Sequence, residues 1–506
     1  MFVRKKKNKS GTISVQIIDK SYGYKVVKTI GSSVNPIEIK KLIGRAWDII
    51  NGRQPKLFSF ITKEELAIKN FLKTFSNEQI RTIGPELIFG SLFDKIGFNA
   101  VKEEMFRHIV IARLAYPTSK LKTVDYLHRY RGIRIEADAV YRFLDKLNER
   151  YKEIAEQIAF EFTKKTLKNI AVVFYDMTTL YFETEDEDDL RKIGFSKDGK
   201  FQNPQIMIGL LVGESGYPIG YDIFKGNVFE GHTLIPALKK IQKKYNFGNP
   251  IVVADAALLS KKNIENLIKE KYEFIIGARI KNETEKIKSK ILKKAESMKN
   301  GNIFFIRKSD DTKLIVSYSD KRQRKDAYNR ERGLRKLKER IKSGKLTKES
   351  INSRGYNKFL SLDGEIKIEI DEDKIEEDKK WDGLKGYITN SKISSKKIIE
   401  NYGHLWQIEK AFRISKTDLR VRPIYHYLQR RIEAHICIAF TAYAIYKELE
   451  RLLNKHKAGF SSKRAAELTD NMYELEYMLP NSDYSEKIIL KMDKEQKQLY
   501  EIIQLL

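Results

Sequence analysis

The spacing of apolar residues divides the first third of the chain into a strand-like start and a long helical stretch. Residues 11–31 alternate between apolar and polar positions and turn at residues 21–24, which predicts a small β-hairpin. From about Glu38 to Lys168 the apolar residues recur at helical spacing. Inside this stretch, a short helix capped by Ser119 is followed by Gly132 and then by a helix from about Ala137. Helix, turn and helix fit either a DNA-reading motif or a plain helical bundle.

At residue 169 the apolar period changes from about 3.6 to 2, which marks the start of a sheet. The expected order is three antiparallel strands, a helix, a strand, a helix and a strand, at residues 170–182, 205–212, 218–224, 233–245, 251–254, 262–271 and 274–278. This is the order of a ribonuclease H-like fold. The predicted fold class is therefore α/β: a ribonuclease H-like mixed sheet flanked by helices, interrupted by a β-rich insertion, with helical N- and C-terminal regions.

The remaining segments predict the domain organisation. The insertion has expected strands at residues 301–306, 313–318 and 364–370 and a basic helix at 321–342, and helices are expected at 429–455, 462–478 and 485–503. We expect six parts. They are a β-hairpin unit (1–35), a helical and DNA-binding region (36–168), a first part of the catalytic core (169–280), the insertion (281–395), a second part of the core (396–456) and a helical C-terminal region (457–506).

Charge narrows the class of partner. The 506 residues include 97 Lys and Arg against 68 Asp and Glu, a formal net charge of +29, which suits a polyanion such as nucleic acid or an anionic membrane surface. No apolar run reaches the roughly 18 residues that a bilayer-spanning helix needs. The single cysteine, Cys437, excludes an intramolecular disulfide. We expect a soluble cytoplasmic protein that does not bind a membrane.

Three acidic residues carry the candidate chemistry. Asp176 and Asp255 interrupt or end apolar runs that predict buried strands, and those two strands are neighbours in a ribonuclease H-like sheet. Glu409 lies in a segment of helical periodicity. Buried carboxylates are costly unless a cation compensates them, and hard cations such as Mg²⁺ take oxygen ligands from separate rigid elements. Two strand-borne aspartates and one helix-borne glutamate therefore suit a pair of Mg²⁺ ions, although each acid alone also fits a cap or an ion pair.

The segment around Glu409 has a second pattern. Tyr402, Glu409 and Lys416 recur every seven residues, and Arg413 lies one turn beyond Glu409. Seven residues are nearly two helical turns, so one continuous helix would place these groups on a single stripe together with Leu405. Such a stripe fits a metal ligand flanked by phosphate contacts, or a solvated helix face.

These motifs together resemble the DDE transposases of bacterial insertion sequences, in the branch with a β-rich insertion between the second Asp and the Glu. That branch has the signature Y-x-x-R-x-x-x-E-x-x-x-x-x-x-K, in which Tyr402, Glu409 and Lys416 match and Leu405 stands at the Arg position. The segments ARLAYPTSKL, WDGLKGYITN and FRISKTDLRVRPIYH are also similar to this family. The resemblance covers about residues 105–445.

The resemblance implies a function and a set of site residues. Asp176, Asp255 and Glu409 would hold two Mg²⁺ ions, for which Mn²⁺ can substitute, and the enzyme would cut double-stranded DNA at terminal inverted repeats and join it to target DNA, as a homodimer in the synaptic complex. It implies DNA contacts from Tyr402, Lys416 and Trp381, the last stacking on a flipped base or else packing in the fold.

Leu405 changes one expectation taken from the resemblance. Since the family carries an Arg there, nearby cations such as Arg413, Arg420 or Arg422 would substitute for it, and Leu405→Arg should leave nicking intact. Two alternative functions stay open: a metal-dependent, structure-selective nuclease or resolvase, and a non-catalytic DNA-binding protein derived from a transposase.

Overall fold

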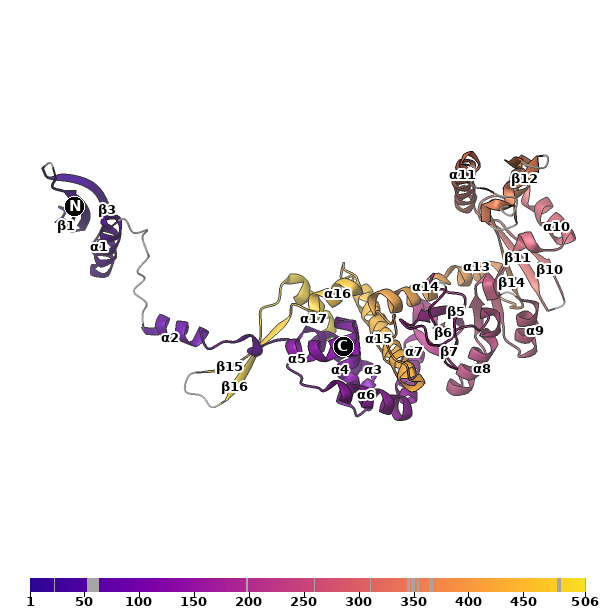
Figure 1. Ribbon diagram of the computed structural model, residues 1–506, viewed down its shortest axis with the longest axis horizontal. Helices are drawn as coiled ribbons and strands as arrows, with labels where there is room; N and C mark the ends of the chain where they lie inside the picture. Colours follow the sequence, from indigo (N-terminus) through magenta and orange to yellow (C-terminus); the bar gives the residue numbers. More distant parts are fainter. Residues whose placement is uncertain are drawn as a thin grey trace. The chain divides into compact units, whose positions relative to one another are not determined.

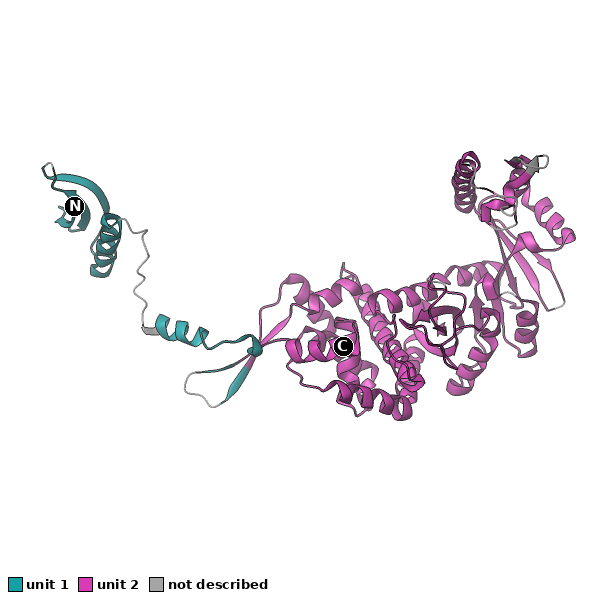
Figure 2. Ribbon diagram, viewed as in Figure 1, with its two compact units in different colours: residues 1–79, 477–486 teal, residues 80–476, 487–506 magenta. Residues whose placement is uncertain are grey.

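The computed structural model (Figures 1 and 2) describes residues 1–21, 23–51, 63–196, 199–258, 260–309, 311–343, 346, 351–352, 355–363, 367–479 and 484–505. The chain forms two compact units, residues 1–79 with 477–486, and residues 80–476 with 487–506. Among the described residues, no helix is both long and apolar enough to cross a membrane.

The first unit contains a three-stranded antiparallel sheet and two helices, with bounds β1 Phe2–Lys7, β2 Ile13–Asp19, β3 Lys25–Ser33, α1 Pro36–Ile50 and α2 Lys63–Leu72. β2 and β3 confirm the predicted hairpin. Val15 and Ile17 of β2 pack against Ile39 and Ala46 of α1 and so form the small core of this unit.

The second unit begins with a short strand and a group of helices, β4 Ile80–Thr82, α3 Ser91–Ile96, α4 Glu104–Ala115, α5 Lys120–Arg131, α6 Ala137–Lys146 and α7 Lys152–Leu167. The Ser119 hydroxyl accepts the Lys122 N–H and caps α5, and Gly132, in the left-handed region at φ +66°, ends it. The predicted succession of capped helix, glycine turn and helix is confirmed.

An eight-stranded mixed sheet forms the centre of the second unit. Its order is β10-β11-β14-β9-β8-β5-β6-β7, with bounds β5 Val172–Tyr181, β6 Gln205–Val212, β7 Pro218–Lys225, β8 Ile251–Ala254, β9 Phe274–Ala278, β10 Ile303–Arg307, β11 Lys313–Tyr318 and β14 Leu384–Thr389. β5, β6 and β7 are antiparallel neighbours, while β8 runs parallel to β5 and β9 parallel to β8. These five strands have the ribonuclease H-like topology, which confirms the predicted fold class.

Helices cover both faces of this sheet. Successive residues of a strand point to opposite faces, so neighbouring residues contribute to two different cores. Phe174 and Val253 share one apolar core with helices α13 Ser395–Gly403, α14 Trp406–Arg413 and α15 Gln429–Lys455. Tyr175 and Val252 point the other way, into a core with helices α8 Leu234–Tyr245, α9 Lys261–Lys269 and α10 Glu285–Ala295.

The segment between β9 and α13 extends the central sheet. β10 and β11 match expected strands, but β14 was not predicted as a strand, and it joins β11 to β9. The other elements here are α11 Asp320–Lys342, β12 Leu360–Asp363, β13 Lys367–Ile370 and α12 Glu372–Lys379, with β12 and β13 forming a separate two-stranded sheet. Of the expected strand at 364–370, residues 364–366 lie outside the described residues.

The C-terminal region corrects two predicted helices. α15 has the expected bounds, but the expected helix at 462–478 is α16 Ser462–Thr469 followed by β15 Tyr473–Met478, and that at 485–503 is β16 Ser485–Ile489 followed by α17 Lys494–Gln504. Within the second unit, Tyr473 and Leu475 of β15 pair with Thr82 and Ile80 of β4. β16 lies on the other side of β15 in the same three-stranded sheet. The helical interpretation was wrong because these strand pairings outweigh the local helical tendency.

Candidate active site

β5 and β8 bring the two predicted aspartates to the same end of the sheet. Tyr175 pairs with Ala254 in the parallel register of these strands, and Asp176 and Asp255 are the next residues on each. Asp176 is half-buried between fully buried neighbours, and its Oδ1 accepts the Met177 N–H at 2.7 Å. Asp255 Oδ1 accepts the Ala257 N–H at 2.8 Å. Both aspartates alternate with Tyr175 and Ala254, so they belong to the sheet face that packs against α13 to α15.

The third predicted acid, Glu409, lies on α14, which packs against β5 and β6. Ile408 and Ala411 bury one side of this short helix, and Glu409 is exposed. Glu409 lies near enough to Tyr402 for its charge to act on that phenol, as Asp255 also does. Burial, then the charges of these carboxylates, raises the pKa of Tyr402 to about 12.

The expectation of one continuous helix through Tyr402, Glu409 and Lys416 is wrong. α13 ends at Gly403, α14 begins at Trp406, and a single π-helical turn follows at Ile414–Asp418. Between these helices, the N–H groups of His404 and Leu405 donate to the carbonyls of Asn401 and Tyr402, three residues earlier, in place of the regular α-helical bonds. The seven-residue repeat therefore does not describe one straight stripe, and the three residues lie on three successive elements.

Leu405 is also placed differently from the prediction. It is 8% exposed and belongs to the apolar core that contains Ile408 and Ala411. A residue in this core does not lie on a DNA-facing stripe. The placement of Leu405 on the stripe is therefore wrong, and the expectation that Leu405→Arg leaves nicking intact stays a prediction.

Tyr402 lies in a compact group of residues beside the aspartates. Its ring makes an edge-on contact with Tyr387 at 4.9 Å between centroids, and Lys385 Nζ lies 4.4 Å from its centroid. A β-carbon on Gly277 would lie 2.4 Å from the Tyr402 hydroxyl, so only glycine leaves room for this phenol. Sequence reasoning missed Lys385, although it alternates with buried residues in the segment LKGY.

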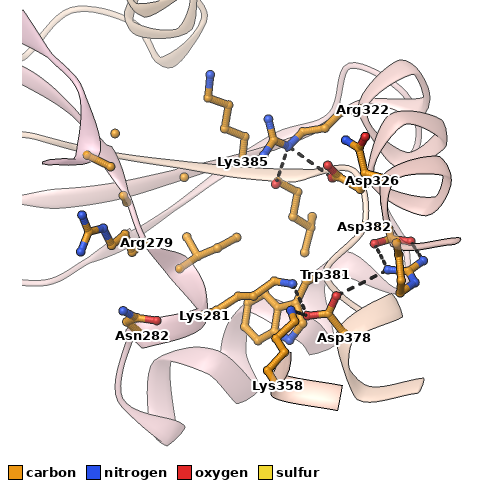
Figure 3. Close-up of a pocket in the computed structure, with 18 of the residues that line it drawn as sticks. Arg279, Lys281, Asn282, Arg322, Asp326, Lys358, Asp378, Trp381, Asp382 and Lys385 are labelled. Atoms are coloured by element: carbon orange, nitrogen blue, oxygen red, sulfur yellow. Dashed lines mark hydrogen bonds and ion pairs between the residues drawn. The ribbon is translucent and has the colours of Figure 1, made fainter. Parts of the chain in front are cut away.

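A cavity of about 520 Å³ opens next to this group (Figure 3), and both Tyr402 and Trp381 line it. Its lining also includes basic side chains from α11, from the turn after β9 and from the end of the insertion, namely Arg279, Lys281, Arg322, Arg330, Lys358 and Lys385. Lys281 and Lys358 each donate to Asp378 Oδ1 at 2.6 Å, beside Trp381. Burial and Arg322 lower the pKa of Lys385, while the charge of Glu409 acts in the opposite direction.

The other predicted DNA contacts do not join this cavity. Lys416 lines a narrow, mostly apolar cavity of about 50 Å³ with Thr178 and Phe412, and Arg413 is exposed at the end of α14. Arg420 and Arg422 line a third cavity of about 460 Å³. The predicted contacts are therefore distributed over several places on the second unit.

The three carboxylates suit a metal site by their chemistry more clearly than by their spacing. Asp176 and Asp255 supply oxygen donors from neighbouring strands, and Glu409 supplies one from the facing helix, which is the donor type that Mg²⁺ and Mn²⁺ prefer. Within the part of the chain that the structure describes, no three His, Cys, Asp or Glu side chains are close enough together to hold an ion. The donors fit a divalent ion in kind, and the ligand set remains a prediction.

Comparison with known proteins identifies the class. The central sheet has the ribonuclease H-like topology. The family described as "Transposase DDE domain" matches residues 168–445, more than half of the chain, and the chain therefore belongs to this family of DNA-transposing enzymes, which cleave and join DNA strands with the help of divalent metal ions. A comparison with curated proteins finds no match.

Solved transposase structures are also similar to the chain. A piggyBac transposase in a synaptic complex with hairpin DNA is 12% identical, with a TM-score of 0.37 over 82% of this chain and 81% of that one. A Mos1 transposase paired-end complex with a left transposon end is 12% identical, with a TM-score of 0.15 over 34% and 58%. A Mos1 mariner paired-end complex with Mn is 16% identical, with a TM-score of 0.15 over 31% and 54%.

Proposed function

We propose that this transposase moves an insertion sequence by a cut-and-paste route. It binds terminal inverted repeats in double-stranded DNA, hydrolyses the strand at each end to free a 3′-hydroxyl, and joins that end to target DNA. The observation that carries this function is the placement of Asp176 and Asp255 directly after the paired residues Tyr175 of β5 and Ala254 of β8, with α14, which carries Glu409, packed against β5.

Asp176, Asp255 and Glu409 are the residues that would hold two Mg²⁺ ions, or Mn²⁺ in their place. When bound, such ions activate the attacking oxygen and stabilise the leaving oxygen of a phosphodiester. The chain itself supplies a rigid frame, because two of the ligands follow paired residues in a sheet and the third projects from a helix packed on that sheet. Tyr402 is buried, the charges of Asp255 and Glu409 act on its phenol, and Lys385 Nζ lies over its ring, so in this proposal it helps to hold the end of the sheet that carries the acids.

DNA binding is supported by the net charge of +29 and by the excess of cations in the cavity beside Trp381, where six Lys and Arg residues line the wall with Asp326, Asp378 and Asp382. A duplex end in this cavity would meet ammonium and guanidinium groups at its phosphates and an indole at its bases, the combination that unpaired nucleotides favour. Arg413, Lys416, Arg420 and Arg422 are further phosphate contacts in this proposal. Because two ends must be held together before joining, the active species would be a homodimer on DNA.

Within the family, the chain fits the branch whose signature around the Glu has Tyr, Arg, Glu and Lys. Tyr402, Glu409 and Lys416 occupy three of the four positions, and the fourth is the buried Leu405. In this proposal the missing guanidinium is replaced by a cation outside the core, such as the exposed Arg413 one turn after Glu409.

The test is a DNA cleavage and joining assay. Purified protein is incubated with Mg²⁺, a DNA that carries the repeats flanking the coding region, and a target plasmid, and we expect both cut ends and joined products. Asp176→Asn and Glu409→Gln should each abolish both products while leaving DNA binding intact. Glu400→Gln, which changes an exposed glutamate on the neighbouring α13, is the matched control and should retain activity.

The products separate the alternatives. Cleavage without joining would favour a structure-selective nuclease or resolvase, and binding without cleavage would favour a non-catalytic DNA-binding protein. Either result would replace cut-and-paste transposition as the function. Normal turnover by Asp176→Asn would show that the acids have been assigned wrongly.

A further inference from the structure

The third cavity, of about 460 Å³, is strongly basic. It is lined by the start of α5, the segment from Arg420 to His426, and residues of α4, α6 and α15. Its side chains include Arg113, Lys120, Lys122, Arg420, Arg422, His426 and His435, and none of its described lining residues is an aspartate or glutamate. A cavity with this much positive charge and no carboxylate in its wall favours an anion.

Lys120 is the most unusual of these side chains. It is 5% exposed, and its Nζ has no hydrogen-bond partner within the described part of the structure. A buried ammonium without a counter-charge costs several kcal/mol, and a lysine with a purely structural role is normally paired. Burial and the nearby Arg113 guanidinium lower its pKa well below the ordinary value. The fold therefore keeps an amine without a partner in the lining of this cavity, at the expense of stability.

Arg113 is a second buried basic residue in the lining of this cavity, which has no carboxylate among its described residues. It is 4% exposed, and its Nη1 donates only long hydrogen bonds, to the carbonyl oxygens of Leu419 at 3.4 Å and Arg420 at 3.3 Å. Burial lowers its pKa to about 10. The Nδ1 atom of His435 is also buried without a partner among the described atoms. Lys120 Nζ and His435 Nδ1 are thus buried in the lining of this cavity without the partner that their chemistry requires, and Arg113 has only long bonds to carbonyl oxygens.

The backbone at the amino end of α5 also favours an anion in this cavity. α5 begins at Lys120, at the wall of the cavity, and is 12 residues long. The amino end of a helix carries partial positive charge and backbone N–H groups that bind phosphate well. On its own this helix end would mean little, but here it lies beside an unpaired, buried ammonium.

We propose that this cavity binds a phosphate group of the DNA backbone, with Lys120 and Arg113 at its base and Arg420 and Arg422 at its rim. This inference rests on the proposed function in one respect, namely that DNA is the substrate. The Arg422 guanidinium lies 5.9 Å from the Tyr181 ring centroid, and Tyr181 is five residues beyond Asp176 on β5. Five residues of strand span roughly 17 Å. A duplex cut at the acids would therefore bring a phosphate several nucleotides from the cut to this cavity, which would fix the register of cleavage.

The experiment measures DNA binding by fluorescence anisotropy, without divalent ions so that no cleavage occurs, at several salt concentrations. Lys120→Met should bind the repeat DNA about tenfold more weakly, and the slope of log K against log salt should fall by about 0.9, the effect of one lost phosphate contact. Its Tm without DNA should equal or exceed that of the wild type, since a buried amine without a hydrogen-bond partner has been removed. Inorganic phosphate should raise the Tm of the wild type but not that of Lys120→Met.

Two further variants keep the result interpretable. Lys447→Met removes another buried lysine, one that is paired with Glu450, and should lower the Tm without changing the salt slope. Arg420→Asn changes an exposed rim residue whose backbone already has a positive φ that Asn tolerates, and it should weaken DNA binding without affecting folding.

Three outcomes would overturn the inference. A folded Lys120→Met with unchanged affinity and salt slope would exclude a phosphate contact, and a lower Tm for this variant would indicate a structural role. A wild type stabilised by inorganic phosphate whose DNA affinity does not depend on Lys120 would indicate a free phosphate ligand. Failure of the wild type to bind any DNA would instead overturn the proposed function, which the phosphate measurement distinguishes.

Discussion

Asp176 and Asp255 directly follow Tyr175 and Ala254, a pair of residues in register on two adjacent parallel strands. Neighbouring strands lie about 4.8 Å apart, so the backbones of the two aspartates stay close whatever their side chains do. Two carboxylates at this spacing repel each other unless a cation lies between them. The register thus brings two acidic positions to one end of the sheet, as the proposed metal site requires.

The first prediction concerns Asp255 as a metal ligand. Asp255→Cys replaces an oxygen donor with a softer sulfur donor, which Mg²⁺ binds poorly and Mn²⁺ accepts better. We expect no measurable cleavage by this variant in Mg²⁺ and partial recovery in Mn²⁺, measured as the initial rate of strand nicking. Ser260→Cys, a change at the cap of α9, is the control and should give the same Mn²⁺ to Mg²⁺ rate ratio as the wild type. An equal loss in both metals would argue that Asp255 has another role.

The second prediction concerns the fit between Gly277 and Tyr402. Gly277→Ala would place a β-carbon 2.4 Å from the phenol oxygen and 3.1 Å from its Cζ atom, and the buried ring has little room to move. We expect a loss of about 1–3 kcal/mol in the free energy of unfolding, together with slower cleavage. Because Tyr402→Phe removes the nearest atom, Gly277→Ala should be less damaging in that background. A double-mutant cycle by urea unfolding measures this coupling, and additive losses would contradict it.

The third prediction concerns the stability of Leu405→Arg, whereas the sequence predicted only that its nicking stays intact. Leu405 is in the core, so a guanidinium there would be buried without a partner or would displace α14. We expect a loss of about 2–4 kcal/mol in the free energy of unfolding, against less than about 1.5 kcal/mol for the matched change Leu405→Met. Urea denaturation measures both. Near-wild-type stability of Leu405→Arg would mean that the side chain reaches solvent.

These cases show which parts of the molecule were predictable from the sequence. The strands that carry Asp176 and Asp255 were predictable because a short, β-branched apolar run with a single acidic residue is typical of a buried strand. The break between α13 and α14 was not, since Gly403 and His404 do not by themselves end a helix and the spacing of Tyr402 and Glu409 suits an unbroken one. β15 was missed for a related reason: its partner β4 is almost four hundred residues away in sequence.

The basic cavity was predictable only in part. Arg420 and Arg422 were singled out from the resemblance, but nothing in the segment PTSKL indicates that Lys120 is buried, because lysine at the start of a helix is normally solvated. Its surroundings include a segment about three hundred residues away in sequence, Arg420 to His426, which lines the same cavity.

The fourth prediction concerns Trp381 as a stacking residue. Trp381 is half-buried and lines the cavity of about 520 Å³ beside Lys385, a volume within the range of ligand-binding sites. Trp381→Ala should weaken binding of a DNA end by about 1–3 kcal/mol, the effect of losing one base–aromatic contact, while Trp381→Phe should lose much less. A second measurement uses DNA with a 2-aminopurine base next to the cut. The fluorescence of this base should rise less when the DNA binds to the Trp381→Phe variant than when it binds to Phe305→Ala, the control variant, which changes an exposed aromatic residue on β10. Equal affinities for Trp381→Ala and the wild type would assign Trp381 to packing alone.

The fifth prediction concerns the pH dependence of stability. His426 is 8% exposed, and burial together with the charges of Lys120, Arg113 and Arg431 lowers its pKa to about 3, against about 6.5 in an unfolded chain. Below pH 6.5 the unfolded state therefore binds a proton that the folded state refuses, so stability is complete above this pH and falls as the pH drops toward 3. Between pH 7.5 and 5.5 the wild type should lose about 1 kcal/mol more than His426→Gln, measured by urea unfolding in phosphate-free buffer. His404→Gln, at an exposed position on the loop before α14, is the control and should keep the wild-type pH dependence. If His426→Gln and the wild type lose stability in parallel, the imidazole of His426 is not held neutral by its burial beside these cations.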